Sequence, residues 1–407
     1  MPASRLRASL HAFAAVLRNP DLRRMALAYL GFSVLEYGTW VALLVYAYDA
    51  SGPAAVGLVA FGQLVPAAFF APLVNSLGDR YRRDRLLVAG YAALALTTLA
   101  VGVAMLVGLP AALVYLVAVA YSCSLTVARP LQAALVPSYA DTAQEVTAGN
   151  AVSTVIDGLG VLIGPLLAGL VLIAGQPGQV FIICAVLVTV STVLAYRLRA
   201  HRPDAIFMPA AAQPSPSTPP QPSMFEGIRQ VSRDTDQRLL VVMLGARYVM
   251  IGALDVLLVL LAIEVLGIGG AGAGYLTAAA GLGGVLGGAL TILLVGRGRL
   301  SPWLAFGAAL FGLGLLLTSV APSSSAAAGM MVVCGISLAI VDVAGRTLLQ
   351  RIVPDEVLAG VFGLVEGFAM AGLAIGSILP SILVSRVGLP ETFVIIAAIL
   401  PIGAVVA

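Results

Sequence analysis

The chain has 407 residues, of which 60% are hydrophobic and only 10% are charged, and its mean hydropathy is +1.04. Soluble domains are roughly 45–50% apolar and about 25% charged, so this composition excludes a soluble enzyme, a nucleic-acid-binding protein and a disordered scaffold. The net charge of +3 reflects arginine alone on the basic side, because the sequence contains no lysine. The three cysteines lie far apart in apolar runs, so neither a disulfide framework nor a metal site is expected, and no cofactor is predicted.

Membrane-spanning helices are the elements that this composition predicts, because a helix needs roughly 20 consecutive apolar residues to cross a bilayer. Twelve such runs can be read from the sequence, six on each side of a long polar stretch. In chain order they cover residues 25–48, 54–76, 86–108, 111–135, 150–174, 179–197, 239–264, 273–295, 303–320, 325–345, 358–384 and 391–407. The predicted fold class is therefore an all-α integral membrane protein with twelve transmembrane helices.

The arginines indicate the orientation of these helices. All arginines except Arg247 and Arg386 fall on one side of the membrane, together with the N-terminus and the long polar stretch. By the positive-inside rule this side faces the cytoplasm. The sequence thus predicts a multi-pass protein of the cell (inner or plasma) membrane, in contact with the lipid bilayer, with both termini cytoplasmic. We expect it to act as a monomer.

The polar stretch marks a domain boundary. Residues 198–238 are rich in proline, serine and glutamine, a composition that cannot bury a core and stays extended. The stretch ends in an amphipathic segment at residues 224–231, which we expect on the cytoplasmic surface. The predicted organisation is an N-terminal six-helix bundle over 1–197, a cytoplasmic linker over 198–238 and a C-terminal six-helix bundle over 239–407.

The two halves repeat each other. Arg129 ends the fourth span and Arg346 ends the tenth, and each is followed by a proline at the same spacing, with leucine, glutamine and valine between. Soon afterwards each half has an acid followed by glycine, at Asp157 and at Glu366. Two pseudo-symmetric bundles related by such a repeat are a known plan for transporters, with the substrate bound between them near the middle of the bilayer.

The loop between the second and third spans carries the best local signature. Residues 75–85 read Asn-Ser-Leu-Gly-Asp-Arg-Tyr-Arg-Arg-Asp-Arg and resemble the signature loop of the major facilitator superfamily. The resemblance extends over nearly the whole chain, and it implies the major facilitator fold and transport by alternating access. Residues 51–58, followed by Pro66, resemble the macrolide-efflux (drug–proton antiporter) and siderophore-exporter branch of this family.

In that family the signature loop latches the two halves together on the cytoplasmic side. A carboxylate near a helix N-terminus gains roughly 0.3–1 kcal/mol, and arginines can bind carbonyls at helix ends. The alternative is that the loop arginines only set the topology. Asp342 and Arg346 lie four residues apart on one helix face and can neutralise each other. The residues that we assign to the cytoplasmic gate are Asp79, Arg80, Arg83, Arg129, Asp342 and Arg346.

Glycine-rich stretches in the fifth and eighth spans predict close helix packing. Residues 160–169 resemble the glycine–proline motif associated with antiporters. The functional interpretation is a tight seam between the two halves, and the alternative is ordinary packing of small residues. The expected seam residues are Gly160, Gly164, Pro165, Gly169, Gly284 and Gly288.

Acids inside the spans are costly in a bilayer and therefore mark candidate functional positions. Glu36 ranks first, because it lies about 18 Å along the helix from Arg24, near the bilayer midplane, between two aromatic residues. An acid in apolar surroundings holds a proton more readily at cellular pH, and aromatic rings suit a lipophilic cation. The alternative is that each acid is neutral and structural. The expected proton-coupling and cavity residues are Glu36, Asp255, Asp157, Glu366, Phe32 and Trp40.

These patterns together predict a secondary active transporter that exports lipophilic, drug-like molecules in exchange for protons. The alternative is a dedicated exporter or flippase of a metabolite or lipid, such as a siderophore, a lysolipid or a fatty acid, on the same fold. A membrane-embedded enzyme or a channel is disfavoured, because His11 and His201 lie outside the spans and no catalytic motif is found. Direct use of ATP is excluded, because the phosphate-binding loop requires a lysine. Sodium coupling and uniport remain open.

Overall fold

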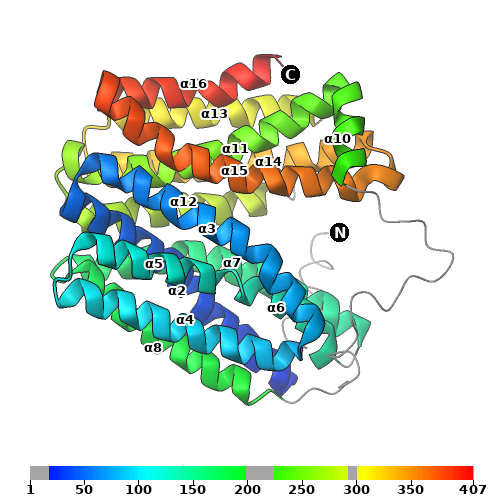
Figure 1. The fold of residues 1–407 in the computed structure, drawn as a ribbon. Coiled ribbons are helices and arrows are strands. Elements are labelled where there is room, and N and C mark those ends of the chain that lie inside the picture. The colour runs from blue at the N-terminus through cyan, green and yellow to red at the C-terminus, as the bar shows by residue number, and fades with distance from the viewer. Residues whose placement is uncertain (1–17, 141, 199–223, 292–299, 407) are drawn as a thin grey trace. The chain divides into compact units, whose positions relative to one another are not determined.

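A computed structural model describes residues 18–140, 142–198, 224–291 and 300–406 of the chain (Figure 1). Within these ranges every regular element is a helix. The elements are α2 (Pro20–Ser51), α3 (Pro53–Arg80), α4 (Arg83–Leu106), α5 (Ala111–Leu125), α6 (Ala128–Tyr139), α7 (Ala143–Leu172), α8 (Pro177–Tyr196), α10 (Met224–Arg233), α11 (Thr235–Leu260), the π-helix η2 (Leu261–Val265), α12 (Gly269–Leu290), α13 (Ser301–Ser319), α14 (Ser324–Ile352), α15 (Asp355–Val387) and α16 (Leu389–Val406).

The helices have the length and composition that a bilayer requires. In the described part of the chain, eleven candidate spans are long and apolar enough to cross a membrane, and a shorter apolar helix covers Leu389–Gly403. Each of the twelve predicted runs overlaps one of these stretches. One span, Ala111–Tyr139, contains two helices, α5 and α6.

Proline explains the division of that span. Residues Thr126 and Val127 form a turn between α5 and α6, and Pro130 stands at the third position of α6. Because proline has no N–H, it cannot donate to the carbonyl four residues earlier, which belongs to Thr126. Proline is tolerated in the first turn of a helix, so α6 starts immediately after the break. The repeat has Thr347 at the matching position, and α14 is continuous there.

Contacts between Cα atoms divide the chain into two compact units. Unit 1 consists of Met1–Ala42 and Val65–Ser217, and unit 2 consists of Leu43–Leu64 and Thr218–Ala407. The end of α2 and the start of α3 are thus grouped with the later helices. The boundary predicted over 198–238 lies partly outside the described residues and stays a prediction.

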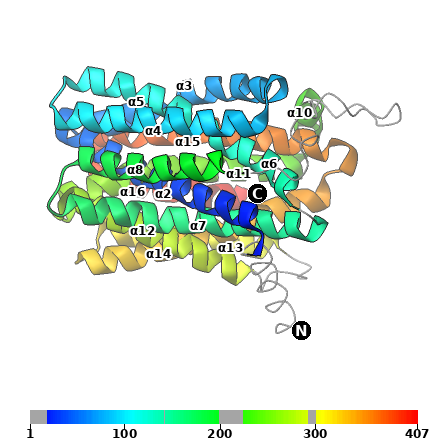
Figure 2. The same ribbon diagram turned by 90° about the horizontal axis from the view of Figure 1, so that it is seen from below.

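Small residues allow close helix packing inside both units. In unit 1, α4 lies along α8 (Figure 1), where a Cβ added to Gly102 would lie 3.0 Å from the carbonyl oxygen of Gly178. In unit 2, α12 lies along α14 (Figure 2), and a Cβ added to Gly287 would lie 2.8 Å from Cα of Ile336. Such contacts let van der Waals forces hold helices together in a medium that supplies no hydrophobic driving force.

The amphipathic segment before the seventh span forms a helix, α10, which packs on α15. A new helix starts after it because Asp234 caps α11, its side chain accepting hydrogen bonds from the N–H groups of Asp236 and Gln237. The Gln237 amide also donates to the carbonyl of Ile352 at the end of α14, at 3.3 Å. These bonds fix the start of α11 relative to α14.

Candidate functional site

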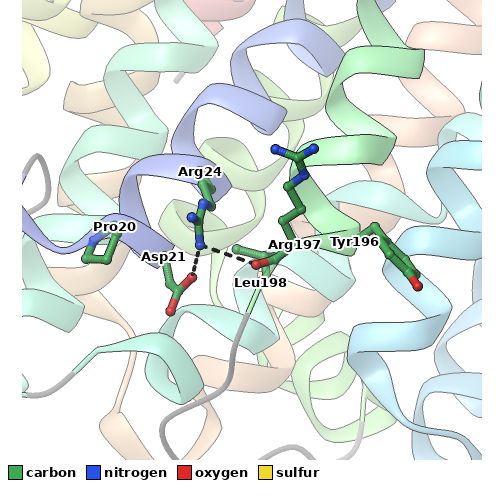
Figure 3. Close-up of a pocket in the computed structure, with 6 residues that line it drawn as sticks. All are labelled: Pro20, Asp21, Arg24, Tyr196, Arg197 and Leu198. Carbon is green, nitrogen blue, oxygen red and sulfur yellow. Dashed lines mark hydrogen bonds and ion pairs between the residues drawn. The ribbon is translucent and has the colours of Figure 1, made fainter.

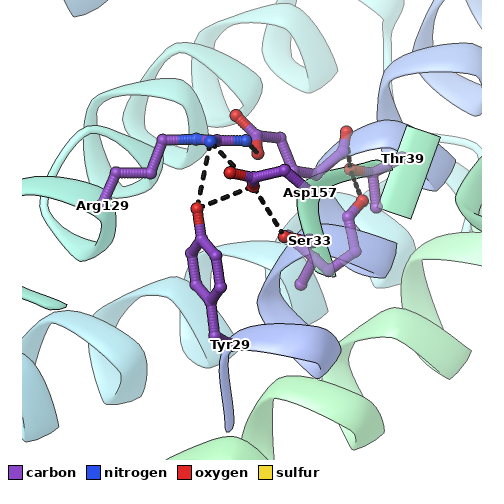
Figure 4. A network of polar contacts seen from close by, with 7 residues as sticks. Tyr29, Ser33, Thr39, Arg129 and Asp157 are labelled. Atoms are coloured by element: carbon purple, nitrogen blue, oxygen red, sulfur yellow. Dashed lines mark hydrogen bonds and ion pairs between the residues drawn. The ribbon is translucent and has the colours of Figure 1, made fainter. Parts of the chain in front are cut away.

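A polar network in unit 1 is centred on Arg129, which lies at the start of α6 (Figure 4). Its Nη2 atom donates to Oε2 of Glu36 on α2 at 2.5 Å. Its Nη1 atom donates to Oδ1 of Asp157 on α7 at 3.0 Å and to the hydroxyl of Tyr29 on α2 at 3.1 Å. One guanidinium thus joins three helices, with two carboxylates as its partners.

The two carboxylates are held differently. Oδ1 of Asp157 accepts hydrogen bonds from three side chains, because the Tyr29 hydroxyl at 2.7 Å and the Ser33 hydroxyl at 3.4 Å add to Arg129 (Figure 4). In the described contacts Glu36 accepts from Arg129 alone. Hydrogen bonds to a carboxylate stabilise its charged form. Asp157 is therefore held by more side-chain hydrogen bonds than Glu36.

Aromatic rings cover the guanidinium. The Cζ atom of Arg129 lies 5.8 Å from the ring centre of Phe32 and 5.9 Å from that of Tyr29, distances suited to cation–π attraction. These two rings stack on each other, and Phe32 is fully buried. Phe32 is therefore placed beside the arginine and faces no open space. Trp40, the second aromatic neighbour expected for Glu36, is half-buried.

The three charged side chains of the network are partly exposed. The exposed fraction of the side chain is 37% for Arg129, 27% for Glu36 and 34% for Asp157. Partly exposed charges in membrane-spanning helices face protein interior or water rather than lipid tails. Two carboxylates against one guanidinium leave one negative charge uncompensated, and a proton or another cation can neutralise it.

Unit 2 contains a second network, centred on Arg346 of α14. Its Nε donates to Asp342 one turn earlier at 3.0 Å, and its Nη2 donates to Glu366 of α15 at 3.1 Å and to the hydroxyl of Tyr248 of α11 at 2.8 Å. Asp342 also pairs with Arg247 of α11 at 3.2 Å. Three helices are again joined by charged groups.

Arg247 is a site residue that the sequence analysis did not assign. It donates to the carbonyl of Leu338 at 3.2 Å, and its guanidinium lies 5.0 Å from the ring centre of Tyr248. The acid on the same helix, Asp255, lies two turns away from Arg247. The acid that forms an ion pair with Arg247, Asp342, lies on another helix. An arginine inside an apolar run is the only signal that could have marked it.

The structure brings together some predicted residues and regroups others. The predicted pair of Asp342 and Arg346 is present as an ion pair. Arg129, expected in a gate apart from the coupling acids, is bonded to two of those acids, Glu36 and Asp157. The reason is that α2 and α7 both reach the start of α6, which spacing along the chain does not reveal.

The stretch expected as the signature loop is described only in part, and its residues 75–80 belong to the end of helix α3 rather than to a loop. The side chains of Asp79 and Arg80 lie outside the described residues, and Arg83 is the first residue of α4. Arg82, which precedes α4, binds Asp84 in the first turn of α4 at 2.8 Å, and this hydrogen bond raises the pKa of Arg82. The gate role of the loop stays a prediction.

Two of the glycines expected in a seam, Gly160 and Gly164, meet neighbours within their own unit. A Cβ added to Gly164 would lie 2.7 Å from the carbonyl oxygen of Val34 and 2.8 Å from the N atom of Gly38, both on α2. A Cβ added to Gly160 would lie 2.6 Å from Cβ of Ser33, also on α2. The glycines of α7, which also contains Pro165 and Gly169, thus permit close packing on α2. Cβ atoms added to Gly284 and Gly288 of α12 would have no neighbour within 4 Å among the residues that the structure describes.

A separate hollow lies where α2 starts and α8 ends (Figure 3). It has a volume of about 640 Å³ and is lined by Pro20, Asp21, Arg24, Tyr196, Arg197 and Leu198. The Arg24 side chain links the two ends of this lining. It donates to the carboxylate of Asp21 at 3.0 Å and to the carbonyl of Arg197 at 3.3 Å. It shares no residue with either charged network. In the ranges that the structure covers, no three His, Cys, Asp or Glu side chains are grouped as a metal site.

The comparisons with known proteins agree with this architecture. The model of the Major Facilitator Superfamily matches residues 25–341 and 240–407. The crystal structure of the nucleoside transporter NupG is similar with a TM-score of 0.74 at 16% identity, covering 95% of this chain and 98% of that one. A bacterial homolog of the human lysosomal transporter Spinster, in an inward-facing and occupied conformation, has a TM-score of 0.71 at 15% identity, covering 94% of each chain.

A transporter of the POT family in complex with 5-aminolevulinic acid is also similar, with a TM-score of 0.73 at 13% identity, covering 95% of this chain and 94% of that one. No curated protein matches the sequence. At these identities the solved structures show the fold alone, so the drug-efflux or siderophore branch stays a prediction. The family match shows a transporter of small molecules in a lipid bilayer, and not an enzyme. The chain belongs to the major facilitator superfamily, whose members are secondary transporters that work by alternating access.

Proposed function

We propose that this transporter exports lipophilic cations in exchange for protons, and that the network of Glu36, Arg129 and Asp157 is its coupling site. The observation that carries the proposal is the charge balance, since one guanidinium faces two carboxylates at a partly exposed position within membrane-spanning helices. An uncompensated negative charge in a membrane is costly. A proton or a cationic substrate removes that cost, and the two compete for the same charge.

Glu36 is the proton acceptor in this proposal. Asp157 receives three hydrogen bonds that favour its charged form, whereas Arg129 is the donor described for Glu36. When Glu36 takes a proton, its ion pair with Arg129 is lost, and Arg129 keeps Asp157 and Tyr29 as partners. The pairing between α2 and α6 therefore changes while that between α6 and α7 persists. Such a change in helix contacts is what coupling to alternating access needs.

The remaining sequence predictions complete the proposal. Both termini are cytoplasmic, as the arginine distribution indicates, and the membrane is the inner or plasma membrane. Asp79, Arg80 and Arg83 latch the cytoplasmic side in the outward-facing state. The protein acts as a monomer without a cofactor.

Transport in proteoliposomes tests the proposal. Under an imposed pH gradient, we expect accumulation of tetraphenylphosphonium, a lipophilic cation, and no change when choline replaces sodium. Neutral uridine and a fluorescent lysolipid serve as comparison substrates. Proton-driven movement of the lysolipid or uridine without movement of the cation would assign the protein to a different cargo. Cation movement that is independent of the pH gradient would remove the proton coupling.

A further inference from the structure

The hollow between the start of α2 and the end of α8 carries a positive charge (Figure 3). Two arginines line it, Arg24 of α2 and Arg197 after α8. Asp21, the acid among the described lining residues, is buried and paired with Arg24 at 3.0 Å. The two arginines therefore exceed this acid by one charge. The volume of about 640 Å³ lies within the range of small-molecule sites, roughly 300–1,000 Å³.

Both guanidinium groups have donors available for a ligand. The described hydrogen bonds of the Arg24 side chain come from Nη1 alone, which donates to Asp21 and to the carbonyl of Arg197. An arginine has five N–H donors, so Nε and Nη2 of Arg24 are left for another acceptor. Arg197 is exposed, and within the described part of the chain its hydrogen bonds are those of its backbone. Guanidinium donors match the paired oxygens of a phosphate group.

Side chains, and not the helix backbone, supply these donors. Asn19 caps α2, because its Oδ1 atom accepts from the N–H groups of Asp21 at 3.0 Å and Leu22 at 3.2 Å. Pro20, the first residue of α2, has no N–H group. The first N–H groups of the helix are thus already bonded, so an anion in the hollow would be bound by the arginines.

Helix α8 indicates the depth of the hollow in the bilayer. It has 20 residues and is therefore about 30 Å long, the thickness of the hydrocarbon core. Its last residue, Tyr196, is then placed where acyl chains meet headgroups, a level at which tyrosine is enriched. The side chain of Tyr196 is 77% exposed. Arg197 follows it directly, at the level of the lipid phosphates.

We infer that this hollow binds the phosphate headgroup of an anionic phospholipid through the guanidinium groups of Arg24 and Arg197. Free phosphate offers the same acceptor oxygens. The lipid is favoured because the exposed ring of Tyr196 lies beside the arginines at headgroup depth. On the predicted orientation the hollow faces the cytoplasmic leaflet, whose anionic lipids attract arginine. The bound lipid joins α2 to α8, whatever substrate and ion the protein transports.

Lipid binding to the purified full-length protein tests the inference. Delipidated protein in neutral detergent is titrated with phosphatidylglycerol or with phosphatidylcholine of the same acyl chains, and native mass spectrometry counts the bound lipids. We expect one phosphatidylglycerol to bind more tightly than the others and more tightly than any phosphatidylcholine. Arg197→Gln should weaken this binding about tenfold, as the loss of a charge-assisted hydrogen bond does. Arg197→Lys, which keeps the charge, should weaken it less.

A matched control separates a site from general attraction between charges. Arg238 is an exposed arginine at the start of α11, far along the chain from the hollow, and Arg238→Gln makes the same change of charge. It should leave the tight phosphatidylglycerol bound. An equal loss in Arg238→Gln and Arg197→Gln, or no loss in Arg197→Gln, overturns the site. Without added lipid, Arg197→Gln should keep the Tm of the unaltered protein, because the side chain makes no described bond.

Inorganic phosphate distinguishes the two sources of the anion. Added in excess, it should not displace the tight phosphatidylglycerol, because it lacks the acyl chains that hold the lipid beside Tyr196. Displacement by inorganic phosphate, with the same dependence on Arg197, would assign the hollow to free phosphate and overturn the lipid site. Equal binding of phosphatidylglycerol and phosphatidylcholine would also overturn it, because the site would then not select a negative charge.

Discussion

Arg129 Nη2 lies 2.5 Å from Oε2 of Glu36, which ties the first residues after the break in the fourth span to the first span. The same guanidinium holds Asp157 through its other nitrogen. Any event that removes the charge of Glu36 therefore changes one of the two ion pairs of Arg129 and spares the other. The predictions below test this arrangement and its surroundings.

Replacing Glu36 with glutamine imitates the protonated acid. The variant should fold and bind cations weakly, but it should lose accumulation driven by a pH gradient while retaining passive exchange, because no proton remains to be released. Uptake of tetraphenylphosphonium with and without the gradient measures both quantities. Asp236→Asn should behave as the unaltered protein does. If Glu36→Gln still accumulates the cation with an unchanged pH profile, Glu36 is structural.

Removing the guanidinium should destabilise unit 1 in a pH-dependent way. In Arg129→Ala the carboxylates of Glu36 and Asp157 repel each other without a counter-ion. Protonation relieves that repulsion, so the loss of Tm relative to the unaltered protein should shrink as the pH falls. Thermal unfolding in detergent at several pH values measures this loss.

A second substitution tests the origin of that loss. Adding Glu36→Gln to Arg129→Ala removes one of the two repelling charges and should restore part of the Tm. An equal loss of Tm at all pH values, with no recovery in the double variant, would show that Arg129 contributes by packing alone.

Gly164 should not tolerate a side chain. An added Cβ would lie 2.7 Å from the carbonyl oxygen of Val34, and backbone atoms of α2 cannot move aside as a flexible side chain can. Overpacking of this kind costs about 1–3 kcal/mol, so Gly164→Leu should lower both Tm and transport. Gly329→Ala is the control, because its Cβ would have no neighbour within 4 Å in the described part of the chain. A stable, active Gly164→Leu would show that α7 and α2 are not packed so closely.

Asp79→Asn tests the latch that the signature loop predicts. The variant should fold yet spend more time inward-facing, because the loop loses the charge that would cap a helix N-terminus. Slower turnover, and weaker cross-linking between the α3–α4 loop and the start of α15, are the expected results. Asp49→Asn, which removes an exposed acid at the end of α2, should change neither. Unchanged cross-linking in Asp79→Asn would contradict the latch.

The sequence predicts what depends on local spacing. The spans follow from the length of apolar runs, and the Asp342–Arg346 pair follows from a separation of one helical turn. The contact of Arg129 with Glu36 joins residues 93 positions apart, so it depends on how three helices assemble. For the same reason the sequence does not predict that Arg247 pairs with Asp342 on α14.

The proline that divides the fourth span makes the two repeats mechanically unequal. Helical hydrogen bonds run without interruption through α14 past Arg346, whereas the bond from residue 130 to residue 126 is missing just beside Arg129. A continuous helix and a helix with a break respond differently to the same force. Arg346 can shift only with its whole helix, but Arg129 sits beside a pivot and can turn with the twelve residues of α6 alone. At these two matched positions the fourth span can therefore bend beside its arginine, whereas the tenth span is continuous at its own.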